Sequence, residues 1–200
     1  MREEIEEEAA VRNLGQLLNY AGVGSDAGVA ETTVRAYFEI LRDTLIGFSV
    51  EHWLASKKRK AIRTAKFFLF DPGVQAALLD RRELSRNSPE FGGALEHWVL
   101  HELRAVRGIR RTHWPITYWR SAAGHEVDFC LGDAVAIEVK ATSRLNDRHF
   151  HGLQAIGEEK IFKRRIMVSF DTATRRGESG TECWPVEEFL LALAEGEWDR

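Results

Sequence analysis

Residues 125–140 read HEVDFCLGDAVAIEVK, and the alternation in this stretch is the clearest structural signal in the chain. Two short runs of alternating residues flank Gly132 and Asp133, which are typical turn residues. Because successive side chains of a strand point to opposite faces of a sheet, the two runs predict a pair of strands. The alternation places apolar residues on one face and charged residues on the other. The sequence therefore predicts a β-hairpin with one packed face.

The register of this hairpin determines whether its acidic residues can meet. A three-residue loop over residues 131–133 pairs Asp128 with Ala136, and it leaves Glu138 and Lys140 on the same face as Asp128. A slip by one residue would mix the two faces, which burial disfavours. We therefore predict that the charged side chains gather on one face. The residues expected on the opposite face are Val127, Phe129, Ile137 and Val139.

An aspartate on one strand, followed ten residues later by Glu-X-Lys on the next, resembles the signature of the PD-(D/E)XK nucleases. Asp128 and Glu138 can hold Mg²⁺ or Mn²⁺ through hard oxygen ligands. Such an ion lowers the pKa of a bound water and neutralises charge on a phosphate. Lys140 would orient the attacking water or stabilise the charged phosphate. The alternative interpretation is a salt bridge of Lys140 with either carboxylate on a solvated face.

A long helix is expected before these strands. Ser88 is a good N-cap and Pro89 a good first helical residue, and the polar residues 80–89 read as a hinge between domains. Glu96 lies at the border of the apolar stripe of this helix. It matches the position from which the first helix of the nuclease fold often brings a third acid to the metal. Glu102 is the alternative candidate.

The first 80 residues predict three helices followed by a two-stranded ribbon at residues 45–50 and 67–70, which is the arrangement of a winged helix. The loop between the ribbon strands, SKKRKAIRTAK, is strongly basic. In winged helices this wing and the third helix usually contact DNA. The expected DNA-contacting residues are Lys57, Lys58, Arg59, Lys60 and Arg63 on the wing and Arg35 on the third helix. A solvated loop beside a protein-binding domain is the alternative.

Further elements complete an α/β fold with a mixed sheet. A strand precedes the hairpin, and a crossover helix, another strand and a final helix follow it. They are expected at residues 109–120, 150–159, 165–170 and 185–194. The order is αβββαβ, in which the crossover makes the last pair of strands parallel. We predict a winged-helix domain over residues 1–80 and a restriction-endonuclease-like PD-(D/E)XK domain over residues 88–200.

Composition restricts the possible functions less than the motifs do. Hydrophobic residues make up 44% and charged residues 30% of the chain, as is usual for soluble proteins. The net charge of −3 means that any nucleic-acid surface must be local. Two cysteines without metal-ligand spacing favour a reducing cytoplasm, and no apolar run is long enough to span a membrane. No GxxxxGK[ST] loop for ATP is present.

Five ordered motifs resemble a domain of unknown function that usually forms the C-terminal half of bacterial and archaeal AAA+ ATPases. They are DTLIGF, KKRKAIRTAKFFLFDPGVQAALL, LEHWVLHEL, YWRSAAGHEVDF and AIEVKA. The resemblance implies a nuclease site of Glu96, Asp128, Glu138 and Lys140, with the three acids around the metal. It also implies DNA and an AAA+ ATPase as partners. Two functions remain open: a Mg²⁺-dependent nuclease, and a non-catalytic module that binds DNA or a protein partner.

Overall fold

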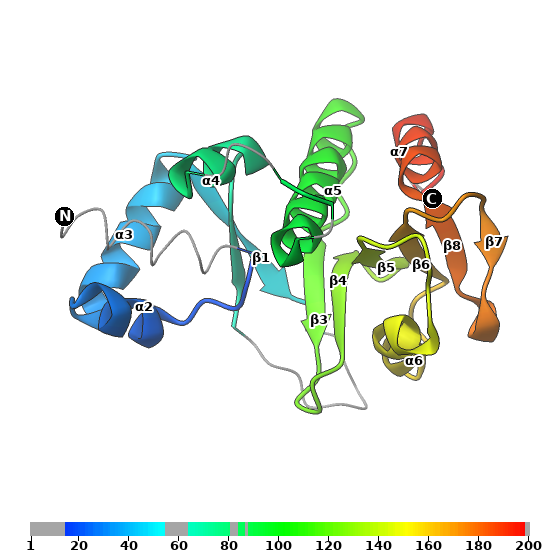
Figure 1. Cartoon of the computed structure of the whole chain (residues 1–200), viewed down its shortest axis with the longest axis horizontal. Helices are drawn as coiled ribbons and strands as arrows, with labels where there is room; N and C mark the ends of the chain where they lie inside the picture. The colour runs from blue at the N-terminus through cyan, green and yellow to red at the C-terminus, as the bar shows by residue number, and fades with distance from the viewer. Residues whose placement is uncertain (1–14, 55–63, 81–83, 87, 199–200) are drawn as a thin grey trace. The chain divides into compact units, whose positions relative to one another are not determined.

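A computed structural model describes residues 15–54, 64–80, 84–86 and 88–198 (Figure 1). Within these residues the chain has six α-helices and eight strands. The strands form a mixed sheet in which neighbours follow the order β2-β1-β3-β4-β5-β6-β8-β7, with both parallel and antiparallel pairs. The predicted mixed α/β class is therefore confirmed. None of these helices combines the length and the apolar character that crossing a lipid bilayer requires.

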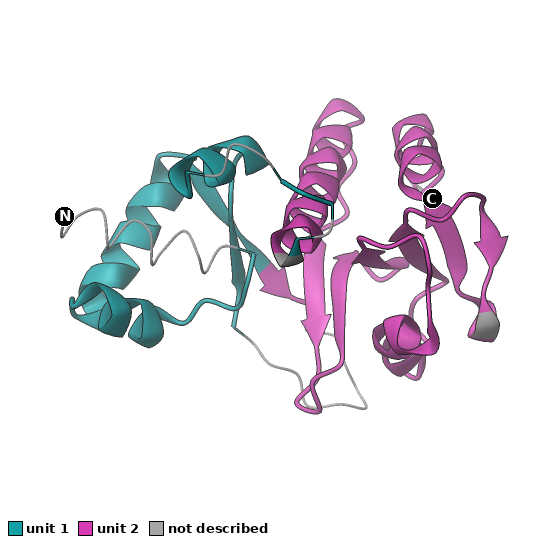
Figure 2. Ribbon diagram, viewed as in Figure 1, with its two compact units in different colours: residues 1–50, 64–88 teal, residues 51–63, 89–200 magenta. Residues whose placement is uncertain are grey.

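The chain divides into two compact units, one of residues 1–50 and 64–88 and one of residues 51–63 and 89–200 (Figure 2). The elements of the first unit are α2 (Tyr20–Ala27), α3 (Glu31–Asp43), β1 (Gly47–His52), β2 (Lys66–Leu69) and α4 (Pro72–Leu78), and the last two residues of β1 already belong to the second unit. β1 and β2 form the predicted antiparallel ribbon. The core of this unit includes Phe38 and Phe67, whose rings meet edge to face at 4.7 Å. The winged-helix arrangement stays a prediction, because residues 2–14 of its first helix, predicted at residues 2–20, lie outside the described part. The prediction is wrong for residues 15–19, which are not helical and in which Leu17 forms a β-bridge with Lys66.

The second unit contains the predicted helix, meander and crossover. Its elements are α5 (Pro89–Ile109), β3 (Ile116–Arg120), β4 (Glu126–Leu131), β5 (Val135–Lys140), η1 (Asp147–Phe150), α6 (His151–Gly157), β6 (Arg164–Ser169), β7 (Arg175–Arg176), η2 (Glu178–Gly180), β8 (Glu182–Pro185) and α7 (Val186–Glu195). β3, β4 and β5 are antiparallel, and β6 pairs parallel with β5, as predicted. α5 and α7 lie on one side of the sheet and α6 on the other (Figure 1).

Three parts of this unit differ from the prediction. α5 begins at Pro89 as expected but continues to Ile109, so the strand predicted from residue 109 begins only at Ile116. The sheet also continues beyond β6 with β8 and β7, which the sequence did not predict. The last two residues of β1 pair in parallel with β3. Beyond them, the main-chain N–H of Trp53 donates to the carbonyl of Tyr118 (2.7 Å), and its Nε1–H donates to Oδ1 of Asp133 (2.8 Å).

The hairpin of β4 and β5 has a register two residues away from the predicted one. Cys130 lies opposite Ala136 rather than Ala134, because the loop begins one residue later than predicted. A shift of two residues in the pairing keeps the side chains of β5 on their predicted faces. Continued by one step, the observed register brings Asp128 level with Glu138. Asp128 and Glu138 therefore lie opposite each other, whereas the predicted register placed Asp128 opposite Ala136.

β4 contains a bulge at the candidate site. Its pairing with β3 shifts by one residue, so that Asp128 and Phe129 both lie opposite Tyr118. The bulge interrupts the alternation of faces, and Val127 packs in the same core cluster as Cys130. The predicted separation of an apolar from a charged face is therefore wrong at Val127. Apolar residues cover both faces of this sheet.

Candidate active site

Asp128, Glu138 and Lys140 meet where β4 and β5 stop pairing. The ladder between the two strands ends at the pair of Phe129 and Ile137, next to Asp128 and Glu138. Oδ2 of Asp128 then accepts a hydrogen bond from the main-chain N–H of Val139 (2.7 Å), which ties this carboxylate to β5. Nζ of Lys140 donates to Oε1 of Glu138 at 2.5 Å. The bulge in one strand and the end of the other thus bring the three charged groups together.

Both carboxylates are buried, and one ammonium faces two acids. Asp128 is 6% and Glu138 5% exposed, whereas the side chain of Lys140 is 31% exposed. Burial and then the charge of Asp128 raise the pKa of Glu138 well above its ordinary value, although Lys140 opposes this. Burial alone would lower the pKa of Lys140, but the two carboxylates outweigh it and the pKa is raised. The ionised forms of the two carboxylates therefore repel each other, and one ammonium does not fully offset this repulsion.

One oxygen of Glu138 has no hydrogen-bond partner among the residues that the structure describes. This oxygen, Oε2, is buried and accepts no hydrogen bond from any of them. It faces α6 closely, since a Cβ added at Gly152 would lie 3.4 Å from it. An unpartnered polar atom inside a protein is costly and calls for an explanation. A divalent cation held by Asp128 and Glu138 would supply the missing charge, so the chemistry of these residues fits Mg²⁺ or Mn²⁺.

The third predicted acid, Glu96, lies half-buried on α5, which contacts β5. Its charge raises the pKa of both Glu138 and Lys140, so it acts on the site electrostatically. The alternative candidate, Glu102, lies 3.7 Å from Nδ1 of His101. In the described part of the chain, no three His, Cys, Asp or Glu side chains are arranged to hold a metal ion. Asp128 and Glu138 therefore provide two adjacent carboxylates, and the carboxylate of Glu96 acts on them from a greater distance.

The raised pKa of Glu138 predicts that stability falls with rising pH. A carboxyl group whose pKa is higher in the folded state binds more protons when folded, so the free energy of unfolding decreases as pH rises. The decrease begins near the ordinary value of 4.5 and continues up to the raised pKa. The Asp128→Asn variant should lose less stability in total over this range, because the neighbouring charge no longer raises the pKa of Glu138. Urea unfolding in EDTA from about pH 4.5 to about pH 8 measures the total loss of stability in both proteins; equal losses would contradict this coupling.

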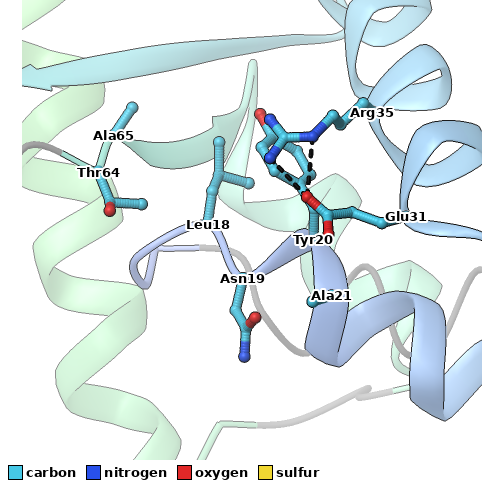
Figure 3. Close-up of a pocket in the computed structure, with 8 residues that line it drawn as sticks. All are labelled: Leu18, Asn19, Tyr20, Ala21, Glu31, Arg35, Thr64 and Ala65. Carbon is cyan, nitrogen blue, oxygen red and sulfur yellow. Dashed lines mark hydrogen bonds and ion pairs between the residues drawn. The ribbon is translucent and has the colours of Figure 1, made fainter.

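The predicted DNA-contacting residues fall into two groups. Those of the basic wing lie outside the described residues: Lys57, Lys58, Arg59, Lys60 and Arg63. Arg35 is described, and it forms an ion pair with Glu31 at 2.6 Å while its guanidinium lies 4.3 Å from the centre of the Tyr20 ring. These three side chains line a pocket of about 370 Å³ in the first unit (Figure 3). Because Glu31 compensates its charge, Arg35 is a weaker phosphate ligand than an unpaired arginine.

Two residues beside the site were missed by the sequence analysis. Gly152 allows α6 to approach β4, because a Cβ at this position would overlap the main-chain carbonyl oxygen of Glu126. A glycine within a predicted helix was the available signal. His149 on η1 lies near enough to Lys140 that burial and this charge lower its pKa. The sequence contained no signal for His149.

Comparisons with known proteins find domains whose function is not known. A family model described as a domain of unknown function (DUF4143) matches residues 91–189, and another domain of unknown function (DUF8612) matches residues 8–85. Uncharacterised proteins of Mycobacterium bovis and Mycobacterium tuberculosis are each 33% identical over 135 residues, covering 64% of this chain and 30% of the relative. The chain thus spans less than a third of those relatives, and no solved structure matches it. The chain is similar to two domains of unknown function in succession, the second of which contains the candidate site.

Proposed function

We propose that this protein is a metal-dependent nuclease that hydrolyses phosphodiester bonds in DNA, as an endonuclease or an exonuclease. The observation that carries the proposal is the buried, unpartnered Oε2 of Glu138 beside the buried carboxylate of Asp128. Two such carboxylates repel each other, and Lys140 neutralises only one of them. A catalytic cation explains why these acids are kept together inside the protein.

The fold assignment is part of the same proposal. α5, the meander β3–β5, the crossover α6 and the parallel strand β6 follow the element order of a PD-(D/E)XK domain. α2, α3 and the β1–β2 ribbon agree with two helices and the ribbon of a winged helix. The proposed fold and the basic sequence of residues 57–63 support DNA as the substrate. An AAA+ ATPase as partner rests on the resemblance of the motifs alone.

Each residue of the site would have a distinct task. Asp128 and Glu138 would hold Mg²⁺ or Mn²⁺, and the ion would supply Lewis-acid chemistry to water and phosphate. The hydrogen bond from Val139 fixes the carboxylate of Asp128 before any ligand binds. The two carboxylates raise the pKa of Lys140, so Lys140 stays protonated at neutral pH. Its task is therefore to donate to a charged phosphate oxygen rather than to accept a proton.

A second candidate function is a non-catalytic module that binds DNA or a protein partner. The 2.5 Å ion pair between Lys140 and Glu138 favours it, because this pair satisfies Oε1 without any metal. In that case the carboxylates and the lysine form a structural ion-pair cluster, as can occur in buried charge networks. The two functions differ in whether the site binds a divalent cation.

Titration calorimetry with Mg²⁺ and Mn²⁺, combined with cleavage assays on single- and double-stranded DNA, tests the proposal. Wild type should bind the ions weakly, and Asp128→Asn should bind them at least about tenfold more weakly. The fold of this variant should be no less stable, because an asparagine oxygen can still accept from Val139 and the repulsion is removed. Asp26→Asn, on the exposed surface of α2 in the first unit, is the control for the loss of one carboxylate. No ion binding by wild type, together with a destabilised Asp128→Asn, would support the second candidate.

A further inference from the structure

His149 lies on the same helical face as the glycine that touches the site. η1 runs directly into α6, and residues three apart in such a segment lie one above the other. Gly152 abuts the carboxylate of Glu138, so His149 lies one turn before this contact. Burial and the charge of Lys140 lower the pKa of His149, which agrees with a position beside the end of β5. His149 therefore borders the candidate site.

The imidazole of His149 is held in one orientation and one tautomer. Its Nδ1 accepts a hydrogen bond from the main-chain N–H of Asn146 (3.2 Å), as part of a capping box at the start of η1. A neutral imidazole that accepts at Nδ1 carries its proton at Nε2. Since the pKa is lowered, the ring is neutral at physiological pH and presents a single N–H donor.

We propose that the Nε2–H of His149 donates a hydrogen bond to a phosphate oxygen of the DNA strand that binds beside Lys140. This inference rests on the proposed nuclease function and adds a substrate-binding residue to its site. A donor that is already fixed by the main chain loses little freedom on binding, so its hydrogen bond contributes efficiently to affinity. A neutral imidazole is also not repelled by the nearby ammonium of Lys140, whereas a second cation at this position would be. The competing explanation is that His149 only caps η1.

Three substitutions at His149 distinguish donation to a phosphate oxygen from capping of η1. In His149→Asn the side-chain oxygen can replace Nδ1 in the cap, but no donor reaches the position of Nε2. In His149→Gln the amide nitrogen reaches the position of Nε2. His149→Ala removes both groups. Affinity is measured by fluorescence anisotropy with a fluorescein-labelled single-stranded oligonucleotide and its duplex in Ca²⁺, and thermal unfolding reports on the cap.

We expect His149→Ala and His149→Asn to bind the oligonucleotide about tenfold more weakly than wild type, and His149→Gln to bind within about twofold. His149→Asn should unfold at the wild-type temperature, which separates its weak binding from loss of the cap. Wild-type affinity in His149→Asn, or a His149→Gln variant as weak as His149→Ala, would overturn the inference. Failure of wild type to bind either oligonucleotide would overturn it too. Cleavage of DNA with Mn²⁺ is assayed on the same samples. If wild type does not cleave DNA, the proposed nuclease function is contradicted, but the affinities of the three His149 variants still test the role of His149.

Discussion

The Gly152→Ala variant should be less stable than wild type by about 3 kcal/mol or more. The added methyl group would overlap the main-chain carbonyl oxygen of Glu126, and a strand backbone yields less readily than a flexible side chain. α6 would have to move away from β4, which also opens the packing against the carboxylate of Glu138. Urea unfolding gives the change in the free energy of unfolding, and DNA cleavage should be lost in parallel.

Gly93→Ala is the matched control for this substitution. Gly93 lies inside α5, it is exposed, and a Cβ there would meet no atom within 4 Å. Alanine should therefore stabilise the protein by up to about 1 kcal/mol, through helix propensity alone. A Gly152→Ala variant as stable as the control would mean that α6 does not pack against β4 as closely as described.

The Lys140→Ala variant should cleave DNA about 10²- to 10³-fold more slowly than wild type, the usual cost of removing one group that stabilises charge in the transition state. Binding of Mn²⁺ should be unchanged or tighter, because the ammonium no longer competes for Oε1 of Glu138. Without metal, the variant should be less stable than wild type, since a buried charge loses its partner. Mn²⁺ should restore that stability by binding the folded state.

Lys163→Ala is the control for the loss of a positive charge, because Lys163 is exposed and lies outside the candidate site. Rapid-quench cleavage and calorimetric Mn²⁺ titration on both variants separate catalysis from ion binding. If Lys140→Ala cleaves DNA at the wild-type rate, the lysine is only an ion-pair partner and its proposed task is wrong.

The parts of the fold that local chemistry determines were predictable from the sequence. Turn residues and alternation located β4 and β5, and Pro89 marked the start of α5. The crossover rule gave the parallel pairing of β6 with β5. The gathering of Asp128, Glu138 and Lys140 was also predictable, because burial allows few places for charged residues on a packed strand.

The register and the bulge were not predictable, because both faces of the sheet are buried. Alternation identifies a face only when the other face is polar, and here Cys130 and Ala136 are as buried as Phe129 and Ile137. A bulge of one residue then leaves no trace in the hydrophobic pattern. β8, with the sequence ECWP, forms a strand because β6 offers it an edge, so its conformation depends on tertiary contacts.

The pairing of Trp53 with β3 inside the second unit has a consequence for dividing the protein into fragments. A fragment that starts at Pro89 would contain α5 and the remaining strands, but it would lack the end of β1 and the indole held by Asp133. The outer side of β3 would then expose unpaired main-chain groups and apolar surface. Such open edges recruit strands from other molecules, so the shortened chain should aggregate more readily than the full chain. The end of β1 thus protects the sheet against self-association.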